Sequence, residues 1–393
     1  MRTGATMQQS SISYFWRRPD ASRGFASGVS LHSHTSMSKE TLKHAAELGT
    51  KYKVLRPIFA NRERYCREVH GFELNFLDSY WTPPLSPRMA FEVERRQIED
   101  QLELPALVSI TDHDDIRAPL ELRSASATRD VPVSVEWSAP YRDSMFHLGI
   151  HNLPGIHAEA WMRVFAEFTA MPSMDWLGVI LAELDALPNV LIVFNHPVWD
   201  LNKIGAERHL FCVNEFLASN NQFIHAMELN GLRGWQENRQ VHALAQKWNQ
   251  VLISGGDRHG IQPNAITNLT QATSFAEFVN EVRRERVSHI HFMASYAVPW
   301  KYRILESTID VISYYPEFPE GTRAWDDRVF HPDANGVATQ LSQLWPGDGR
   351  PPVFVRSVLG GVRMLGKKPL SSSLRLAWND RQGFRMALSN QEG

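Results

Sequence analysis

Seven short apolar runs, each followed by polar or titratable residues, constrain the fold of this chain more than any other feature. The runs are GVSLHSH (28–34), ALVSITDHD (106–114), VPVSVEWS (131–138), MFHLGIHNL (145–153), VLIVFNHP (190–197), FIHAMELNG (223–231) and VLISGGDRHG (251–260). Their length and their β-branched content are typical of buried strands. We therefore expect a sheet of about seven strands.

Helical patterns lie between several of these runs. In residues 236–248 apolar side chains recur at i, i+3, i+4 and i+7, and residues 274–287 repeat the pattern behind a capping box of Ser274 and Glu277. Strands that alternate with helices predict a parallel sheet, and about seven such units favour a barrel over an open sheet. The predicted fold class is α/β, with a TIM-like barrel.

The spacing of the runs also predicts the domain organisation. We expect an N-terminal segment over 1–25, a main domain that contains the seven runs over 26–299 and a C-terminal extension over 300–393. An insertion over 50–104 separates the first two strands and is much longer than a usual crossover. Its aromatic and proline residues suit a packed lid or subdomain.

Composition excludes several classes of protein. The 393 residues carry a formal net charge of −2, which argues against nucleic acid or an anionic membrane as the partner. Cys66 and Cys212 are far apart in sequence and form no CxxC motif, which argues against a disulfide framework. The N-terminus lacks an apolar run of signal-peptide length, so we expect a cytoplasmic protein. The sequence leaves the oligomeric state open.

Imidazoles and carboxylates recur where the predicted strands end. Because the carboxyl ends of barrel strands open onto one face, these side chains should converge on one pocket. Mixed imidazole and carboxylate ligands suit Zn²⁺, Mn²⁺ or Fe²⁺ better than Mg²⁺ or Ca²⁺. A single such histidine is more often structural, but a set of eight predicts a metal site. The set is His32, His34, His113, Glu136, His147, His196, Asp257 and His259.

In order and placement, these motifs resemble the PHP (polymerase and histidinol phosphatase) superfamily of metal-dependent phosphoesterases. The resemblance rests on LHSHT, ITDHD, VSVEWS, FHLGIH, NHP and GGDRHG, and covers about residues 26–295. It implies a distorted (β/α)7 barrel and two or three divalent metal ions. The implied first metal site is His32, His34, Glu136 and Asp257; Glu136 bridges to a second site with His147 and His196; His113 and His259 belong to a third.

The chain departs from the family pattern in the stretch SMSKE. Many members place an aspartate ligand of the third metal at the position of Lys39, and an ammonium cannot bind a cation. Other members place a histidine one residue later, at Glu40. Glu40 could complete the third site, or Lys39 and Glu40 could simply open a solvated helix.

The implied activity is hydrolysis of a small-molecule or nucleotide phosphomonoester by a metal-activated hydroxide. The resemblance gives catalytic roles to Glu136, Asp257 and His196. Arg258 could bind phosphate, although strand parity would turn it away from the metals towards a structural salt bridge; Arg233, Arg62 and Arg64 are other candidates. Two alternatives stay open: an amidohydrolase-type enzyme acting on a C–N or C–O bond, and a non-catalytic barrel that metals only stabilise.

Overall fold

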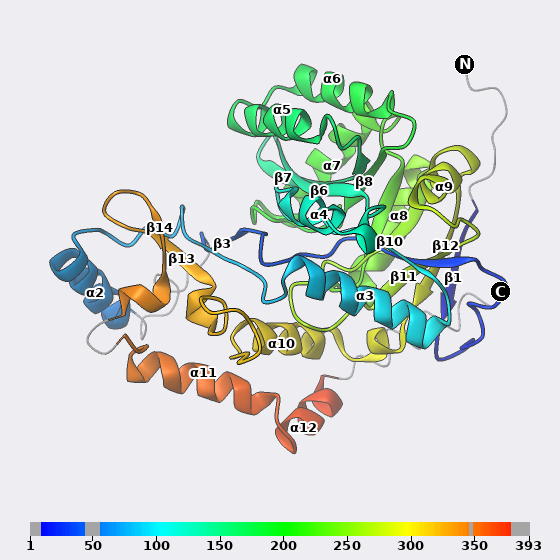
Figure 1. The fold of residues 1–393 in the computed structure, drawn as a ribbon. Coiled ribbons are helices and arrows are strands. Elements are labelled where there is room, and N and C mark those ends of the chain that lie inside the picture. Colours follow the sequence, from blue (N-terminus) through cyan, green and yellow to red (C-terminus); the bar gives the residue numbers. More distant parts are fainter. Residues whose placement is uncertain (1–8, 44–55, 346–348, 379–393) are drawn as a thin grey trace.

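The computed structural model describes residues 9–43, 56–345 and 349–378. These residues form a mixed α/β fold with three sheets. Figure 1 shows two of the sheets surrounded by α3 to α9, with the third sheet set apart beside α2 and α10 to α12 below. No helix in the described ranges is both long and apolar enough to cross a bilayer.

The first two sheets have five strands each and contain all seven runs seen in the sequence. The first has the order β1 (Gln9–Tyr14), β12 (Val287–Phe292), β11 (Ile266–Thr270), β2 (Ser27–Ser30) and β5 (Ala106–Val108). The second has the order β10 (Val251–Gly255), β9 (Ala226–Asn230), β8 (Leu191–Asn195), β7 (Ser144–Leu153) and β6 (Val133–Tyr141). Every residue of β8, β9 and β10 is buried, as expected for strands covered on both faces.

The sheets are not wholly parallel, which corrects the sequence expectation. β7 runs antiparallel to both β6 and β8, and β11 runs antiparallel to β2 and β12. A short turn joins β6 directly to β7 without a crossover helix, so the chain reverses there. His147 lies near the start of β7, opposite Asn195 at the end of β8. The reversal therefore keeps His147 at the same end of the sheet as the other candidate ligands.

Main-chain hydrogen bonds link the two large sheets beyond their named strands. On one side, Asp257 N donates to His32 O at 2.8 Å; on the other, Glu136 N donates to Asp112 O at 3.1 Å. The strand assignment gives two open sheets rather than one closed ring among the described residues, so the expected α/β class is confirmed and the expected (β/α)7 barrel is not. The bonds nevertheless bring the ends of β2, β5, β6 and β10 together.

Helices cover the large sheets. Two of the predicted helix features are confirmed: a helix over Trp235–Trp248 and the capping box of Ser274 and Glu277. The second predicted helix is α9 followed by a π turn at Glu281–Glu285. The helices around these sheets are α3 (Pro87–Leu102), α4 (Arg117–Arg123), α5 (Ala158–Ala170), α6 (Met174–Asp185), α7 (Ala206–Asn220), α8 (Trp235–Trp248) and α9 (Phe275–Asn280).

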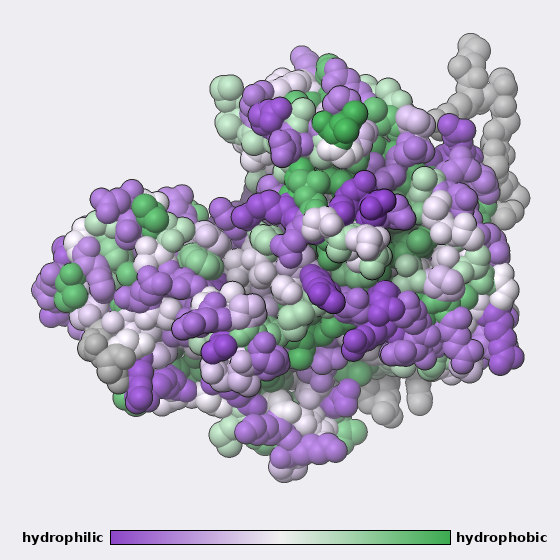
Figure 2. All heavy atoms as spheres, in the orientation of Figure 1, coloured by the Kyte–Doolittle hydropathy of each residue, from purple (hydrophilic) through white to green (hydrophobic). Residues whose placement is uncertain are grey.

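The long insertion and the C-terminal extension meet in a third, four-stranded sheet. Its order is β14 (Ala338–Gln340), β13 (Val329–Pro332), β4 (Tyr80–Trp81) and β3 (Glu40–Thr41). The helices beside it are α2 (Arg56–Tyr65), α10 (Trp300–Val311), α11 (Val353–Leu365) and α12 (Leu370–Ala377). We call this sheet with α2 and α10 to α12 the outer lobe. Figure 2 shows a largely hydrophilic surface over both parts, with scattered apolar patches. Cys66 and Cys212 are buried and free.

Candidate metal centre

The candidate ligands come from the strand ends through a strained backbone. His32, His196 and Asp257 have positive φ angles of 63°, 28° and 53°. Residues other than glycine rarely adopt such angles, which cost about 1–3 kcal/mol each and cluster at functional sites. Here they follow β2, β8 and β10, where the chain turns out of the sheet. Three of the eight residues that the sequence predicted to converge thus have this backbone conformation, as do seven other non-glycine residues outside that set.

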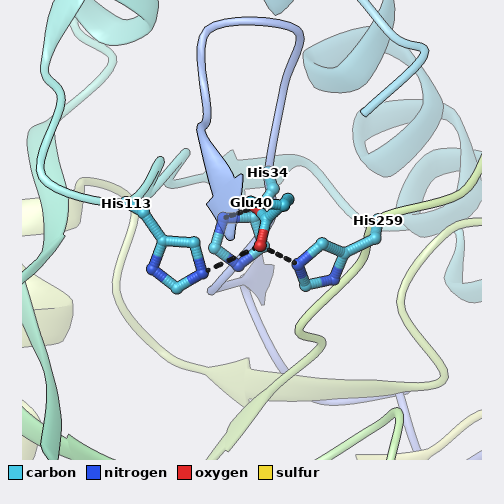
Figure 3. Close-up of side chains that lie close together, drawn as sticks. All are labelled: His34, Glu40, His113 and His259. Atoms are coloured by element: carbon cyan, nitrogen blue, oxygen red, sulfur yellow. Dashed lines mark ion pairs between the residues drawn. The ribbon is translucent and has the colours of Figure 1, made fainter. Parts of the chain in front are cut away.

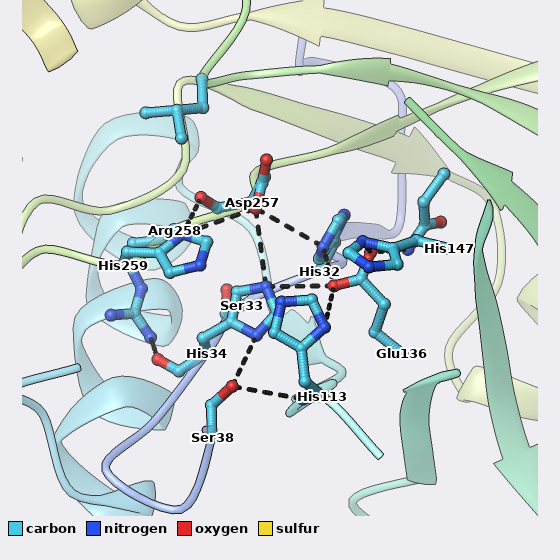
Figure 4. A network of polar contacts seen from close by, with 12 residues as sticks. His32, Ser33, His34, Ser38, His113, Glu136, His147, Asp257, Arg258 and His259 are labelled. Carbon is cyan, nitrogen blue, oxygen red and sulfur yellow. Dashed lines mark hydrogen bonds and ion pairs between the residues drawn. The ribbon is translucent and has the colours of Figure 1, made fainter. Parts of the chain in front are cut away.

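The carboxylate of Glu136 lies at the centre of the cluster (Figure 4). Glu136 is fully buried in β6. Its Oε2 atom lies 3.0, 3.3 and 3.2 Å from ring nitrogens of His32, His34 and His113. Its Oε1 atom lies 3.2 Å from His147 Nδ1 and 3.2 Å from His196 Nε2. A single carboxylate thus faces two groups of imidazoles, as a bridging ligand would.

Asp257 closes the cluster from the side of β10. Its Oδ1 atom lies 3.7 Å from His32 Nε2, 3.5 Å from His34 Nε2 and 3.4 Å from His259 Nδ1. The side chain is almost fully buried. Asp257, after β10, and Glu136, in β6, therefore both approach His32 and His34. The two carboxylates are 121 residues apart in sequence (257 − 136).

A second group of ligands surrounds Glu40 (Figure 3). Glu40 Oε2 lies 3.3 Å from His113 Nε2 and 3.3 Å from His259 Nε2, while Oε1 lies 3.9 Å from His34 Nδ1. Together these four residues offer ligand atoms that all lie within 4.8 Å of one another. The structure thus brings Glu40 together with His113 and His259, the residues considered for a third site, and adds His34 to them.

Pairing with the insertion explains why Glu40 and not Lys39 faces the cluster. Glu40 pairs with Trp81 of β4, so the stretch is a short strand here and not the first turn of a helix. Side chains alternate along a strand, so neighbours point to opposite faces. The Lys39 ammonium lies 5.1 Å from the centre of the Tyr80 ring, and the Glu40 carboxylate lies between two imidazoles.

Four buried atoms within this cluster have no hydrogen-bond partner among the described residues. They are His32 Nε2, His34 Nε2, His113 Nδ1 and Glu136 Oε2. Buried polar atoms are rarely left unsatisfied because their desolvation costs about 1–3 kcal/mol each. Imidazole nitrogens that surround a carboxylate oxygen in this way suit divalent cations, which would take the place of any protons that the rings carry. The donor set therefore fits divalent metal ions.

The electrostatics of the cluster agree with this fit. Burial alone would raise the pKa of the Glu136 carboxyl, but His32, His147 and His113 hold that pKa well below its usual value. Burial likewise opposes the charge on Glu40, yet His113 and His259 lower its pKa well below the usual range. Both carboxylates are thus ionised and ready to bind a cation. Burial lowers the pKa of His196 to about 3, which keeps that imidazole neutral.

Several contacting residues were missed by the sequence analysis. Glu228 of β9 is buried, and its Oε2 atom lies 2.5 Å from His32 Nδ1, which leaves Nε2 directed at the cluster. Carboxylates commonly orient metal-binding histidines in this way. Asn195 donates to Glu136 Oε1 at 2.9 Å, and Ser38 donates to Glu40 Oε1 at 2.7 Å. Glu228 lies in the middle of β9, and only the presence of a carboxylate inside a predicted buried strand could have indicated it.

Arg258 does not reach the cluster, which corrects its candidate catalytic role. Its guanidinium donates to Glu94 Oε1 at 2.8 Å, to Gly260 O at 2.8 Å and to His34 O at 3.0 Å. Strand parity turns it away from Asp257 and His259, so it forms the buried salt bridge that was the alternative prediction. Figure 4 shows Arg258 on the side of His34 away from Glu136.

Of the other arginine candidates, Arg233 lies beside the cluster. Its guanidinium is 3.6 Å from Asp257 Oδ2, and its Cζ atom is 3.2 Å from the centre of the Trp199 ring. Arg62 and Arg64 instead line a cavity in the outer lobe with Tyr65, and the metal ligands do not line that cavity.

Comparison with known proteins gives little further guidance. No family model matches the chain, and no curated protein is similar to it in sequence. Similar solved structures include an amidohydrolase from Chromobacterium violaceum (14% identity, 59% of this chain, 87% of that chain, TM-score 0.34). Another is a candidate metal-dependent phosphoesterase from Bifidobacterium adolescentis (13% identity, 52% of this chain, 92% of that chain, TM-score 0.34). A third is PsfC from Pseudomonas syringae (12% identity, 69% of this chain, 93% of that chain, TM-score 0.36). At these TM-scores the structural likeness is weak and does not assign a function to this chain.

Proposed function

We propose that the chain is a metal-dependent phosphoesterase that hydrolyses a small-molecule or nucleotide phosphomonoester, as the PHP resemblance implies. The observation that carries the proposal is the position of Glu136, whose two oxygens face separate groups of histidines at 3.0–3.3 Å. A second carboxylate, Glu40, faces a third group. Clusters of adjacent cations suit phosphate esters because the charge of the phosphoryl oxygens must be neutralised.

The ligand groups correspond to two or three ions of Zn, Mn or Fe. When bound, such ions lower the pKa of water so that hydroxide forms near neutral pH, and they neutralise the phosphate. We assign His32, His34, Glu136 and Asp257 to the first ion and His147 and His196, with Glu136, to the second. Glu40, His113 and His259 would hold the third.

The remaining residues orient the reaction. Glu228 fixes the ring of His32, and Arg233 offers a cation beside Asp257 for a non-bridging phosphate oxygen. Water supplies a hydroxyl to phosphorus and a proton to the departing alcohol, and the P–O ester bond breaks. No side-chain nucleophile is required, and both cysteines, Cys66 and Cys212, are buried.

Turnover of model esters tests the proposal. The metal-free protein is assayed with p-nitrophenyl phosphate and bis-p-nitrophenyl phosphate before and after addition of Mn²⁺ or Zn²⁺. We expect metal-dependent release of nitrophenol, faster from the monoester. Hydrolysis of an amide or lactone without turnover of either phosphate would favour the amidohydrolase alternative, and absence of all turnover would favour the non-catalytic barrel.

Adjacent substitutions test the role of Glu40. Glu40→Gln removes the carboxylate charge from the third site, so we expect elemental analysis to show fewer metal ions per chain. Lys39→Gln is the matched control, because its side chain is exposed and directed at Tyr80. Metal content that is unchanged from wild type in Glu40→Gln would exclude Glu40 as a ligand.

A further inference from the structure

A cavity adjoins the Glu40 side of the cluster and is not explained by metal binding. Its volume is ≈ 500 Å³, and Glu40 and His259 form part of its wall. The rest of the wall is mainly apolar and includes Trp81, Trp199, Trp325, Leu232, Ile304 and Val311. Cavities of this size and character typically bind small organic ligands.

Three tryptophans from distant segments meet in this cavity. Trp81 comes from the insertion, Trp325 from the C-terminal extension, and Trp199 from the loop after β8. The Trp81 ring lies 5.8 Å from the His259 ring, and the Trp199 ring lies 4.9 Å from the His196 ring in an edge-on contact. The aromatic wall is thus in contact with candidate ligands on two sides, within reach of a substrate held at the metals.

Polar groups are few in this wall, and two of them, Arg328 and Thr308, donate hydrogen bonds to the main chain. Arg328 donates to Thr322 O at 2.7 Å, to Val311 O at 2.7 Å and to Ser313 O at 2.9 Å. Thr308 donates to Ile304 O at 2.8 Å within α10. A ligand rich in hydroxyls would therefore lose hydrogen bonds to water without recovering them here, which costs free energy for each unpaired group.

We propose that this cavity, which we call the tryptophan pocket, binds the organic half of the substrate and selects phosphomonoesters of apolar, aromatic alcohols over sugar phosphates. The inference rests on the proposed phosphoesterase function. A phosphate at the cluster would direct its ester group past Glu40 and His259 into the pocket. There an aromatic ring packs against the tryptophans, which is favourable beyond the area that it buries.

Two alkyl esters with similar leaving groups test the selectivity. We compare kcat/KM of the Mn²⁺-loaded protein for 2-naphthylmethyl phosphate and for glycerol 1-phosphate. Both release a primary alcohol, so the comparison does not depend on the high reactivity of aryl phosphates. We expect the naphthylmethyl ester to be preferred by about 10- to 100-fold. An equal or reversed preference would overturn the inference and leave the phosphoesterase function standing.

A variant that fills the tryptophan pocket provides a second test, in which ligand binding is measured. Ile304→Trp places a larger side chain in the pocket, whereas Lys301→Trp adds the same ring to the exposed side of α10 as a control. By calorimetry with the Mn²⁺-loaded protein, 2-naphthylmethylphosphonate should bind about 10- to 100-fold more tightly than methylphosphonate. We expect Ile304→Trp to remove this difference and Lys301→Trp to keep it.

The calorimetric outcomes separate the two proposals. Equal binding of both phosphonates to the wild-type protein, or an unchanged difference in Ile304→Trp, overturns the tryptophan pocket alone. Failure of both phosphonates to bind, together with no turnover of any phosphate ester, overturns the phosphoesterase function and the inference with it.

Discussion

The metal cluster and the outer lobe are built in opposite ways. The cluster gathers titratable side chains that are nearly all buried, and it leaves several of their atoms without a hydrogen-bond partner among the described residues. The outer lobe gathers aromatic and aliphatic side chains; the NH groups of the adjoining Arg328 donate to main-chain carbonyls, and its buried Nε atom alone has no partner among the described residues. The metal cluster offers polar atoms that could bind a cation, whereas the outer lobe offers apolar surface that could contact an organic group.

This contrast suggests a division of roles between chemistry and recognition. The two regions meet at Glu40, which belongs to β3 of the outer sheet and yet contacts His113 and His259 of the cluster. Substitutions in the cluster should affect every substrate, whereas substitutions in the pocket wall should affect only some.

Loss of the central carboxylate should have the largest effect. Glu136→Gln keeps the size of the side chain but removes the charge shared by five imidazoles. We expect kcat/KM for every phosphate ester to fall at least about a thousandfold, or about 4 kcal/mol, because the ions would lose their common ligand. Glu207→Gln, at an exposed position on α7, is the control. Activity close to wild type in a folded Glu136→Gln protein would refute the shared site.

Loss of Arg258 should affect stability more than chemistry, although it lies between two candidate ligands. Arg258→Met leaves Glu94 as a buried, unpaired charge, which should cost about 3–5 kcal/mol of unfolding free energy in denaturant titrations. Replacing Glu94 by Leu in the same protein should restore part of this loss. A drop in kcat/KM as large as that of Glu136→Gln, without a loss of stability, would instead show a direct catalytic role.

Substitution of Glu228 should have a smaller effect, specific to the metal. Glu228→Gln keeps a hydrogen-bond acceptor but weakens its hold on the ring of His32. We expect metal affinity to fall about 10- to 100-fold, measured by competition with a chelator, with little change in folding. Unchanged affinity would mean that His32 is oriented by its backbone alone.

The pH dependence of metal binding is the mildest test. Burial would lower the pKa of His113, but the carboxylates of Glu40 and Glu136 raise it to about 10 in the metal-free protein. Below that pH the imidazole is protonated, and binding of a metal must displace the proton. Metal affinity should therefore rise with pH from about 7 towards 10, by up to about tenfold per unit. An affinity independent of pH over this range would show that His113 is not a ligand.

Linkage also predicts the stability of the metal-free protein. Because the pKa of His113 is higher in the folded protein than the usual 6.5, its protonation stabilises the fold fully below about pH 6.5. That contribution is lost as the pH rises towards 10. Thermal melts of the metal-free protein across this window should show a decreasing Tm, and addition of metal should reduce the dependence.

The sequence predicted the strands and their terminal residues because both are local properties. A buried apolar run followed by a polar residue indicates a strand end regardless of its partners, and all seven runs proved to be strands. His32 and Asp257 could therefore be placed near each other before the fold was known. The alternation of side chains likewise predicted that Arg258 could point away from its two neighbours.

Features that depend on distant pairing could not be predicted. The reversal at β7 depends on a turn at Arg142 and Asp143, which lacks the usual Asn-Gly or Asp-Gly signal. The orientation of Glu40 depends on β4, about forty residues later in the chain, and the tryptophan pocket joins Trp81 to Trp325. The pattern of residues within one segment does not indicate which distant segment it will contact.

Anomalous X-ray scattering from crystals grown with Mn²⁺ would locate the bound ions relative to Glu136. We expect separate peaks on the two sides of Glu136, one beside His32 and Asp257 and one beside His147 and His196, with a further peak at Glu40. Crystals of the Glu136→Gln variant grown in the same way should lack at least one of the two peaks beside position 136. Mn²⁺-loaded crystals with no peak within this cluster would contradict the account.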